Sequence, residues 1–236
     1  MLDFHAYSEF TQTTYRKVRD LFRAEVVVRF GEVDIGANET MISRVENGIP
    51  TIILKHGTIL TEDCFCHELY HLLMKGVSGY HFLQATGYFL AELKRKYHNP
   101  PMIVGKCHSI LQHSFFFPKM IEAGFSPTSY LLEQMDQQKQ TYPSCYSNKD
   151  RKANVIMDAW HIMLGRSDSK IDSTVYVNFF AEGFGPYFEK AKTIAEILRY
   201  FDDPVDEPNF FCRVLSILSD IRNIHYSVQG KTVVYH

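Results

Sequence analysis

Apolar spacing along the first third of the chain predicts a helix followed by three short strands. Hydrophobic residues recur at helical intervals over residues 3–23. The anchors of this predicted helix are Tyr7, Phe10, Tyr15, Val18 and Phe22. Runs rich in β-branched residues predict strands at residues 24–30, 40–45 and 51–54, and a turn at residues 46–48 separates the last two.

A second helix is predicted over residues 62–75. Thr61 is a favourable N-cap residue, and the acidic side chains that follow it suit the positive end of the helix dipole. Gly76 is placed to end the helix. The apolar positions expected to face the core are Phe65, Leu69, Leu72 and Leu73.

The rest of the chain is mainly helical in pattern. The predicted helices cover residues 81–97, 104–123, 130–140, 151–164, 186–200 and 209–221. Pro118 is expected to kink or break the second of these helices. A strand is predicted at residues 174–180, and a hairpin at residues 226–235 turns at Gln229 and Gly230. The expected fold class is therefore α+β, with a small sheet packed on the helix at residues 62–75 and a mainly helical C-terminal half.

Composition narrows the class of protein. Hydrophobic residues make up 45% of the 236 residues, which is enough for a large core. A net charge of −2 gives no general attraction to nucleic acid or anionic membranes, so neither is expected as a partner. No signal peptide or membrane-length apolar run is visible, and five irregularly spaced cysteines suit a reducing compartment. These features predict a cytoplasmic protein and leave its oligomeric state open.

The predicted helix at residues 62–75 carries the stretch His67-Glu68-Leu69-Tyr70-His71, an H-E-x-x-H pattern. Histidines four residues apart project from one face of a helix, where their imidazoles can hold one zinc ion. Glu68 is then placed to take the proton of a water that the metal activates. A surface helix with two histidines and a carboxylate is the alternative interpretation. The preceding strand, the N-cap and the apolar face favour the metal site.

A catalytic zinc site normally takes three protein ligands, so a third is needed. His113 is the preferred candidate because apolar and aromatic residues surround it in the sequence. His108 lies five residues earlier, about 140° away on a helix, and so is not expected to bind the same ion as His113. His108, Glu92 and Cys64 remain alternatives to His113 as the third ligand.

The segment from His67 to Lys75, followed by His113 in an aromatic-rich helix, resembles the zincin metallopeptidases, including the ImmA/IrrE-like peptidases. The similarity covers roughly residues 24–124. It implies zinc bound by His67 and His71, with Glu68 as general base. It also implies a small sheet against this helix, in which an edge strand can hold an extended substrate.

Two functions follow from these patterns. The first is a zinc-dependent metallopeptidase that hydrolyses peptide bonds of a specific intracellular protein, with zinc held by His67, His71 and His113 and with Glu68 as base. The second is a non-proteolytic regulatory or binding protein built on a zincin-like scaffold. The expected division places a metallopeptidase core in residues 1–125 and a helical part in residues 126–236, although both can belong to one domain.

Overall fold

The computed structural model divides the chain into two compact units, which are Met1–Tyr80 and His81–His236. The described residues are 6–31, 41–77, 84–85, 87–127, 135–136, 142, 144, 146–222, 224–228 and 231–235. The domain division expected after residue 125 stays a prediction.

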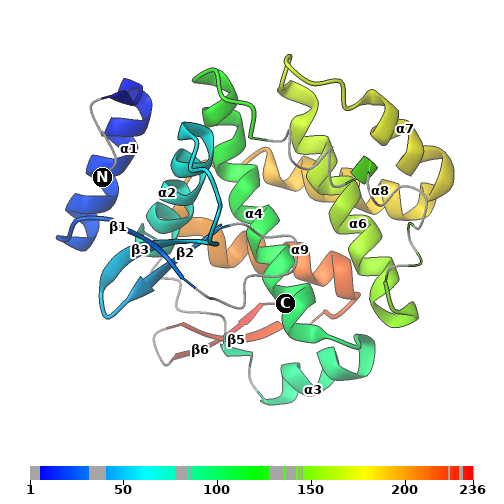
Figure 1. Ribbon diagram of the computed structural model, residues 1–236. Coiled ribbons are helices and arrows are strands. Elements are labelled where there is room, and N and C mark those ends of the chain that lie inside the picture. Colours follow the sequence, from blue (N-terminus) through cyan, green and yellow to red (C-terminus); the bar gives the residue numbers. More distant parts are fainter. Residues whose placement is uncertain are drawn as a thin grey trace. The chain divides into compact units, whose positions relative to one another are not determined.

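The first unit contains two helices and a three-stranded sheet (Figure 1). Its elements are α1 (Glu9–Phe22), β1 (Val27–Phe30), β2 (Met41–Glu46), β3 (Ile49–Leu54) and α2 (Glu62–Val77). The strand order is β1-β3-β2, with β1 parallel and β2 antiparallel to β3. Asn47 and Gly48 both have positive φ, which suits the tight turn of a β-hairpin. The three predicted strands and both helices are confirmed.

The core of this unit lies between α1, α2 and the sheet. Its fully or almost fully buried residues are Val18, Ile52, Leu54, Phe65, Leu69 and Leu72. Three of them, from α2, occupy positions that the apolar spacing of the sequence assigned to the core. The sheet is therefore packed on the helix that carries the H-E-x-x-H stretch, as expected.

The two ends of α2 differ in how well the sequence predicted them. Thr61 caps the start, because its Oγ1 accepts a hydrogen bond from the backbone N–H of Cys64 at 3.3 Å. Gly76 does not end the helix, which continues to Val77. A Cβ atom at Gly76 would lie 2.3 Å from Cδ2 of Leu21 on α1. The glycine serves the close approach of two helices, a role that local sequence does not reveal.

Glu62, the first residue of α2, accepts hydrogen bonds from the start of α1. Its Oε1 accepts hydrogen bonds from the N–H and the hydroxyl of Ser8 and from the hydroxyl of Thr11, at 2.6–2.8 Å. Burial alone would raise the pKa of Glu62, but these hydrogen bonds outweigh it and lower that pKa below its ordinary value. Ser8 is also the N-cap of α1, so the helix begins at Glu9 rather than near residue 3.

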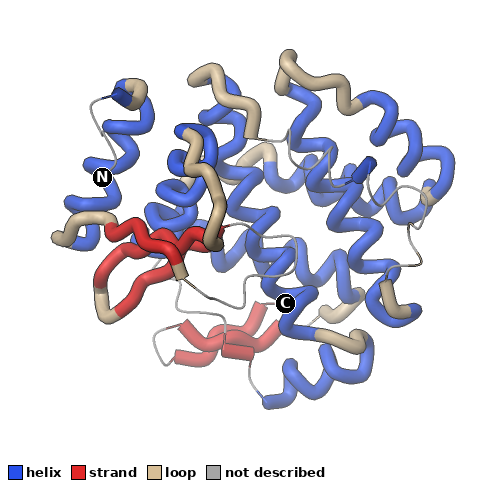
Figure 2. The backbone as a smooth tube through the Cα atoms, viewed as in Figure 1, coloured by secondary structure: helices blue, strands red, loops and turns tan. Residues whose placement is uncertain are grey.

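Helices form most of the second unit (Figure 2). Its elements are β4 (Gln84–Ala85), α3 (Gly87–Lys96), α4 (Pro100–Glu122), α6 (Asn148–Leu164), α7 (Thr174–Gly183), α8 (Gly185–Leu198), α9 (Glu207–Ser219), β5 (Ile224–Val228) and β6 (Lys231–Tyr235), with 3-10 turns at Gly165–Ser167 and Pro204–Asp206. The three strands form an antiparallel sheet in the order β4-β5-β6. None of the described helices combines the length and apolar character that a membrane crossing requires. The α+β class is confirmed.

Two local predictions in this unit are wrong. Residues 84–85 form a strand that pairs with β5, although the pattern there was interpreted as helical. Residues 174–180 belong to helix α7, although their β-branched and aromatic residues indicated a strand. Tyr176 and Phe180 are buried one helical turn apart, so tertiary packing overrides strand propensity. Pro118 does not break α4, which continues to Glu122.

The remaining differences concern ends and undescribed segments. Helix α4 starts at Pro100 because the side chain of Asn99 accepts a hydrogen bond from Met102 N–H, and proline is tolerated in a first turn. Strands β5 and β6 confirm the predicted hairpin, but its turn at residues 229–230 lies outside the described residues. The same holds for most of the helix predicted at residues 130–140.

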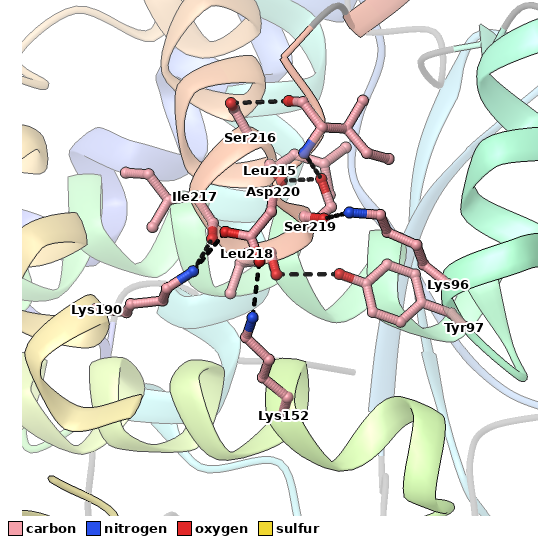
Figure 3. A network of polar contacts seen from close by, with 11 residues as sticks. Lys96, Tyr97, Lys152, Lys190, Leu215, Ser216, Ile217, Leu218, Ser219 and Asp220 are labelled. Carbon is pink, nitrogen blue, oxygen red and sulfur yellow. Dashed lines mark hydrogen bonds and ion pairs between the residues drawn. The ribbon is translucent and has the colours of Figure 1, made fainter. Parts of the chain in front are cut away.

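Side chains from α3, α6 and α8, and Tyr97 directly after α3, donate hydrogen bonds to the C-terminal end of α9 (Figure 3). Lys96, Tyr97 and Lys190 donate to backbone carbonyls of its last turn. Asp220, in the left-handed region just after the helix, forms ion pairs with Lys152 and Lys190 at 2.7 and 2.6 Å. Cations at this end complement the helix dipole and satisfy carbonyls that no intrahelical N–H can reach.

Candidate metal centre

His67 and His71 lie one turn apart on α2, as the four-residue spacing predicts. Their Nε2 atoms are 3.0 Å apart, and both rings are partly buried. Burial lowers the pKa of His67 to about 4, so this imidazole is neutral near pH 7. The neutral ring is the form that donates a lone pair to a metal ion.

Glu68 is buried between α2 and strand β2 of the same unit. Its carboxylate accepts hydrogen bonds from the backbone N–H and the side chain of Ser43. The Nζ atom of Lys75 donates to the carbonyl of Ser43. Burial raises the pKa of Glu68, and Ser43 and Lys75 act in the opposite direction. The carboxylate is thus held beside an edge strand of the sheet.

The strand register explains why Ser43 meets these side chains. Val45 of β2 faces Pro50 of β3, which has no N–H to donate, so this pair exchanges no ladder hydrogen bonds. Because such pairs alternate with bonded ones, Met41, Ser43 and Val45 turn their backbone polar groups to the outer edge of β2. The carbonyl of Leu54 fits this alternation, since it accepts from Gly31 on the β1 side.

His113 lies on α4 in a tightly packed aromatic environment. Its side chain is 3% exposed. Phe117 stacks on the imidazole with centroids 4.4 Å apart, and Phe116 meets it edge-on at 5.3 Å. Its Nδ1 is 2.7 Å from Nε2 of His161 on α6. The apolar and aromatic shell expected around His113 is present.

His67, His71 and His113 form a group that can hold a metal ion. One ring nitrogen from each lies within 4.8 Å of the others, and all three side chains come from helices. Three imidazoles are a donor set that zinc accepts readily. Two nitrogens of a tetrahedral zinc site lie about 3.3 Å apart, close to the 3.0 Å between His67 and His71. The metal itself is not identified by this geometry.

The other candidate ligands do not join this group among the residues that the structure describes. Glu92 forms an ion pair with Arg95 at 2.9 Å. His108 contacts the fully buried Glu207 at 2.6 Å. Cys64 is partly buried on α2 as a free thiol.

His161 is the residue whose importance sequence reasoning missed. No spacing rule links it to the H-E-x-x-H stretch, so the sequence alone gives it no role at the site. It lies 48 residues after His113, on a different helix. Only the packing of α4 against α6 brings the two rings together.

Comparisons with protein-family models, curated proteins and solved structures gave no match in any of the three. The functional argument for this chain therefore depends on the geometry of its own residues.

Proposed function

We propose that this protein is a zinc-dependent peptidase, with zinc held by His67, His71 and His113 and with Glu68 as general base. The observation that carries the proposal is the grouping of the three histidines within 4.8 Å. Two of them come from an H-E-x-x-H helix, and the glutamate of that pattern is present. This combination supports hydrolysis over a purely structural metal site.

Zinc held by His67, His71 and His113 would supply Lewis acidity, which would polarise a peptide carbonyl and acidify a water molecule. The protein supplies the proton transfers. Glu68 follows His67 directly on α2 and takes a proton from the attacking water. It later delivers that proton to the leaving amine, so one carboxylate serves both halves of the reaction.

Strand β2 supports an extended peptide as the proposed substrate. Its outer edge presents backbone groups at Met41, Ser43 and Val45, and an extended peptide can pair with such an edge. At Ser43 the incoming peptide competes with Glu68 and Lys75, which already bond to that residue. We therefore propose that the substrate is an extended segment of a specific protein partner. The peptide bond that lies next to Glu68 would be the one cleaved.

Metal analysis tests the site. We expect one zinc per chain in protein purified and reloaded with zinc, measured by plasma mass spectrometry. His67→Ala, His71→Ala and His113→Ala should each lose most of it, because a three-ligand site cannot spare one. The matched control is His98→Ala, since His98 is exposed in the second unit. A wild-type protein that cannot be loaded with zinc would refute the site and the peptidase together.

A peptide-pool assay tests the chemistry. Zinc-loaded protein is incubated with a mixed pool of synthetic peptides, and new termini are found by mass spectrometry. Glu68→Gln should keep its zinc and lose roughly 10²- to 10⁴-fold in cleavage rate, because it removes the base but no ligand. Cleavage by Glu68→Gln at the wild-type rate contradicts the assigned role.

The tie between Glu68 and Ser43 also favours a second candidate, a non-proteolytic binding protein on the same scaffold. In such a protein the buried Glu68 carboxylate would stabilise the packing of α2 on β2 and would not act as a base. A zinc-loaded wild-type protein that cuts no peptide, together with a Glu68→Gln variant that keeps its cellular effect, would select this second candidate.

A further inference from the structure

His113 and His161 form a hydrogen-bonded pair of imidazoles inside the second unit. The nitrogens lie 2.7 Å apart, and both side chains are buried. The ring centroids are 4.8 Å apart with 23° between the planes. The centroid distance is close to the greatest value that two imidazoles joined by a 2.7 Å hydrogen bond can have. The two rings therefore meet edge to edge and lie in almost one plane.

Phe117 holds that plane. Its ring lies at 4.4 Å and 12° from His113, and at 5.9 Å and 26° from His161. The phenyl ring therefore stacks on His113 and is inclined by only 26° to His161 at a longer distance. Phe116 contacts His113 edge-on and limits its rotation from another side. The hydrogen bond to His161 is a polar contact on the edge of the His113 ring that faces α6.

The bond also decides where protons reside. Two neutral imidazoles share one hydrogen, so one ring donates and the other accepts. If His161 donated from Nε2, His113 would keep its own hydrogen on Nε2 and could not bind metal there. If His113 donates from Nδ1, its Nε2 carries a lone pair and is available as a ligand.

We infer that His161 is a positioning residue for the metal centre, which accepts the Nδ1–H of His113 and so fixes that ligand in its metal-binding tautomer and orientation. The inference rests on the proposed zinc site. A ligating histidine usually donates its other N–H to a carboxylate, a carbonyl or water. Here a second histidine takes that place, and His161 is not a member of the three-histidine group.

Two substitutions distinguish the role of His161 as a hydrogen-bond acceptor from its role in packing. His161→Gln keeps an acceptor near the position of Nε2, whereas His161→Leu keeps apolar volume and removes it. Zinc affinity, measured by competition with a chromogenic chelator, should fall roughly 10- to 100-fold in His161→Leu. His161→Gln should recover most of that loss. His98→Leu on the exposed surface is the control and should bind zinc like the wild type.

These results distinguish the inference from the proposal beneath it. If the wild type binds zinc and His161→Leu binds it with the same affinity, the role of His161 is overturned. The same holds if His161→Leu and His161→Gln bind zinc equally weakly. In both cases the zinc site itself stands. A wild type that binds no zinc overturns the proposed function instead.

A measurement on the unmutated protein keeps the test valid if the variants fold poorly. Long-range ¹H–¹⁵N spectra of the zinc-free wild type should show His113 with its hydrogen on Nδ1. A hydrogen on Nε2 of His113 in the zinc-free and zinc-loaded protein would overturn the inference without any substitution.

Discussion

The H-E-x-x-H helix α2 and the histidine pair on α4 and α6 position their candidate metal ligands in different ways. On α2, His67 and His71 are four residues apart, so helix geometry places both on one face, and their Nε2 atoms lie 3.0 Å apart. His113 depends on a partner 48 residues away, and on aromatic rings of its own helix. Local spacing thus determines one half of the candidate site, and packing between helices determines the other.

The difference has a physical consequence for mutation. Substitutions that weaken the packing of α2 lower the stability of the first unit but leave the spacing of its two histidines unchanged, because that spacing belongs to the helix. Substitutions between α4 and α6 can displace His113 without unfolding anything. Substitutions in the packing of α2 should therefore lower the stability more than the metal affinity. Substitutions between α4 and α6 should lower the metal affinity more than the stability.

The largest effect is expected for Leu69→Ala in α2. Leu69 is fully buried, so the lost contacts and the remaining cavity should cost about 2–5 kcal/mol of the free energy of unfolding. Urea unfolding measures it. Leu73→Ala, at a partly buried position of the same helix, should cost less. Zinc affinity of the folded Leu69→Ala protein should equal that of the wild type, and a large drop would break the comparison.

Glycine-to-alanine substitutions in α2 and α4 should have opposite signs. At Gly76 the new Cβ meets the side chains of Leu21 and Phe22 at 2.3–2.9 Å, and such overpacking costs about 1–3 kcal/mol. At Gly105 in α4 nothing lies within 4 Å, so alanine should stabilise the helix by about 0.5–1 kcal/mol. Thermal unfolding compares the two variants. Equal signs would show that Gly76 is not required by the approach of α1.

A smaller effect, about 1 kcal/mol, is expected for Glu62→Gln, which keeps an acceptor but removes the charge. The folded state lowers the pKa of Glu62, so its charge stabilises the fold above the ordinary value of 4.5. That contribution disappears as the pH falls through the lower, folded-state pKa. Urea unfolding should therefore separate wild type and variant at neutral pH and not in strong acid. A pH-independent difference contradicts the assignment.

Asp220→Asn is the matched case in the second unit. Asparagine tolerates the left-handed backbone at this position, so the substitution tests the ion pairs alone. More than half of the Asp220 side chain is exposed, so solvent screening should keep the loss below that of Glu62→Gln.

Predictions from the sequence succeeded where structure follows from neighbouring residues. The strands of the first unit, the start of α2 at Thr61 and the pairing of His67 with His71 all depend on local pattern. The predictions failed at Gly76 and in α7, where a contact between distant segments decides the outcome. His113 lies with His67 and His71 in a group that could hold a metal ion, but in the sequence its aromatic neighbours alone could not exclude Glu92, His108 or Cys64.

The sequence by itself determined the α+β class, the H-E-x-x-H helix and the face from which its histidines project, because these depend on backbone periodicity within a few residues. The packed fold was needed to show that His113 lies within 4.8 Å of His67 and His71, and that its Nδ1 lies 2.7 Å from Nε2 of His161. It also showed that Glu68 lies against Ser43 at the edge of β2. Each of these features joins residues far apart in the chain, and only the packed fold specifies which distant side chains meet.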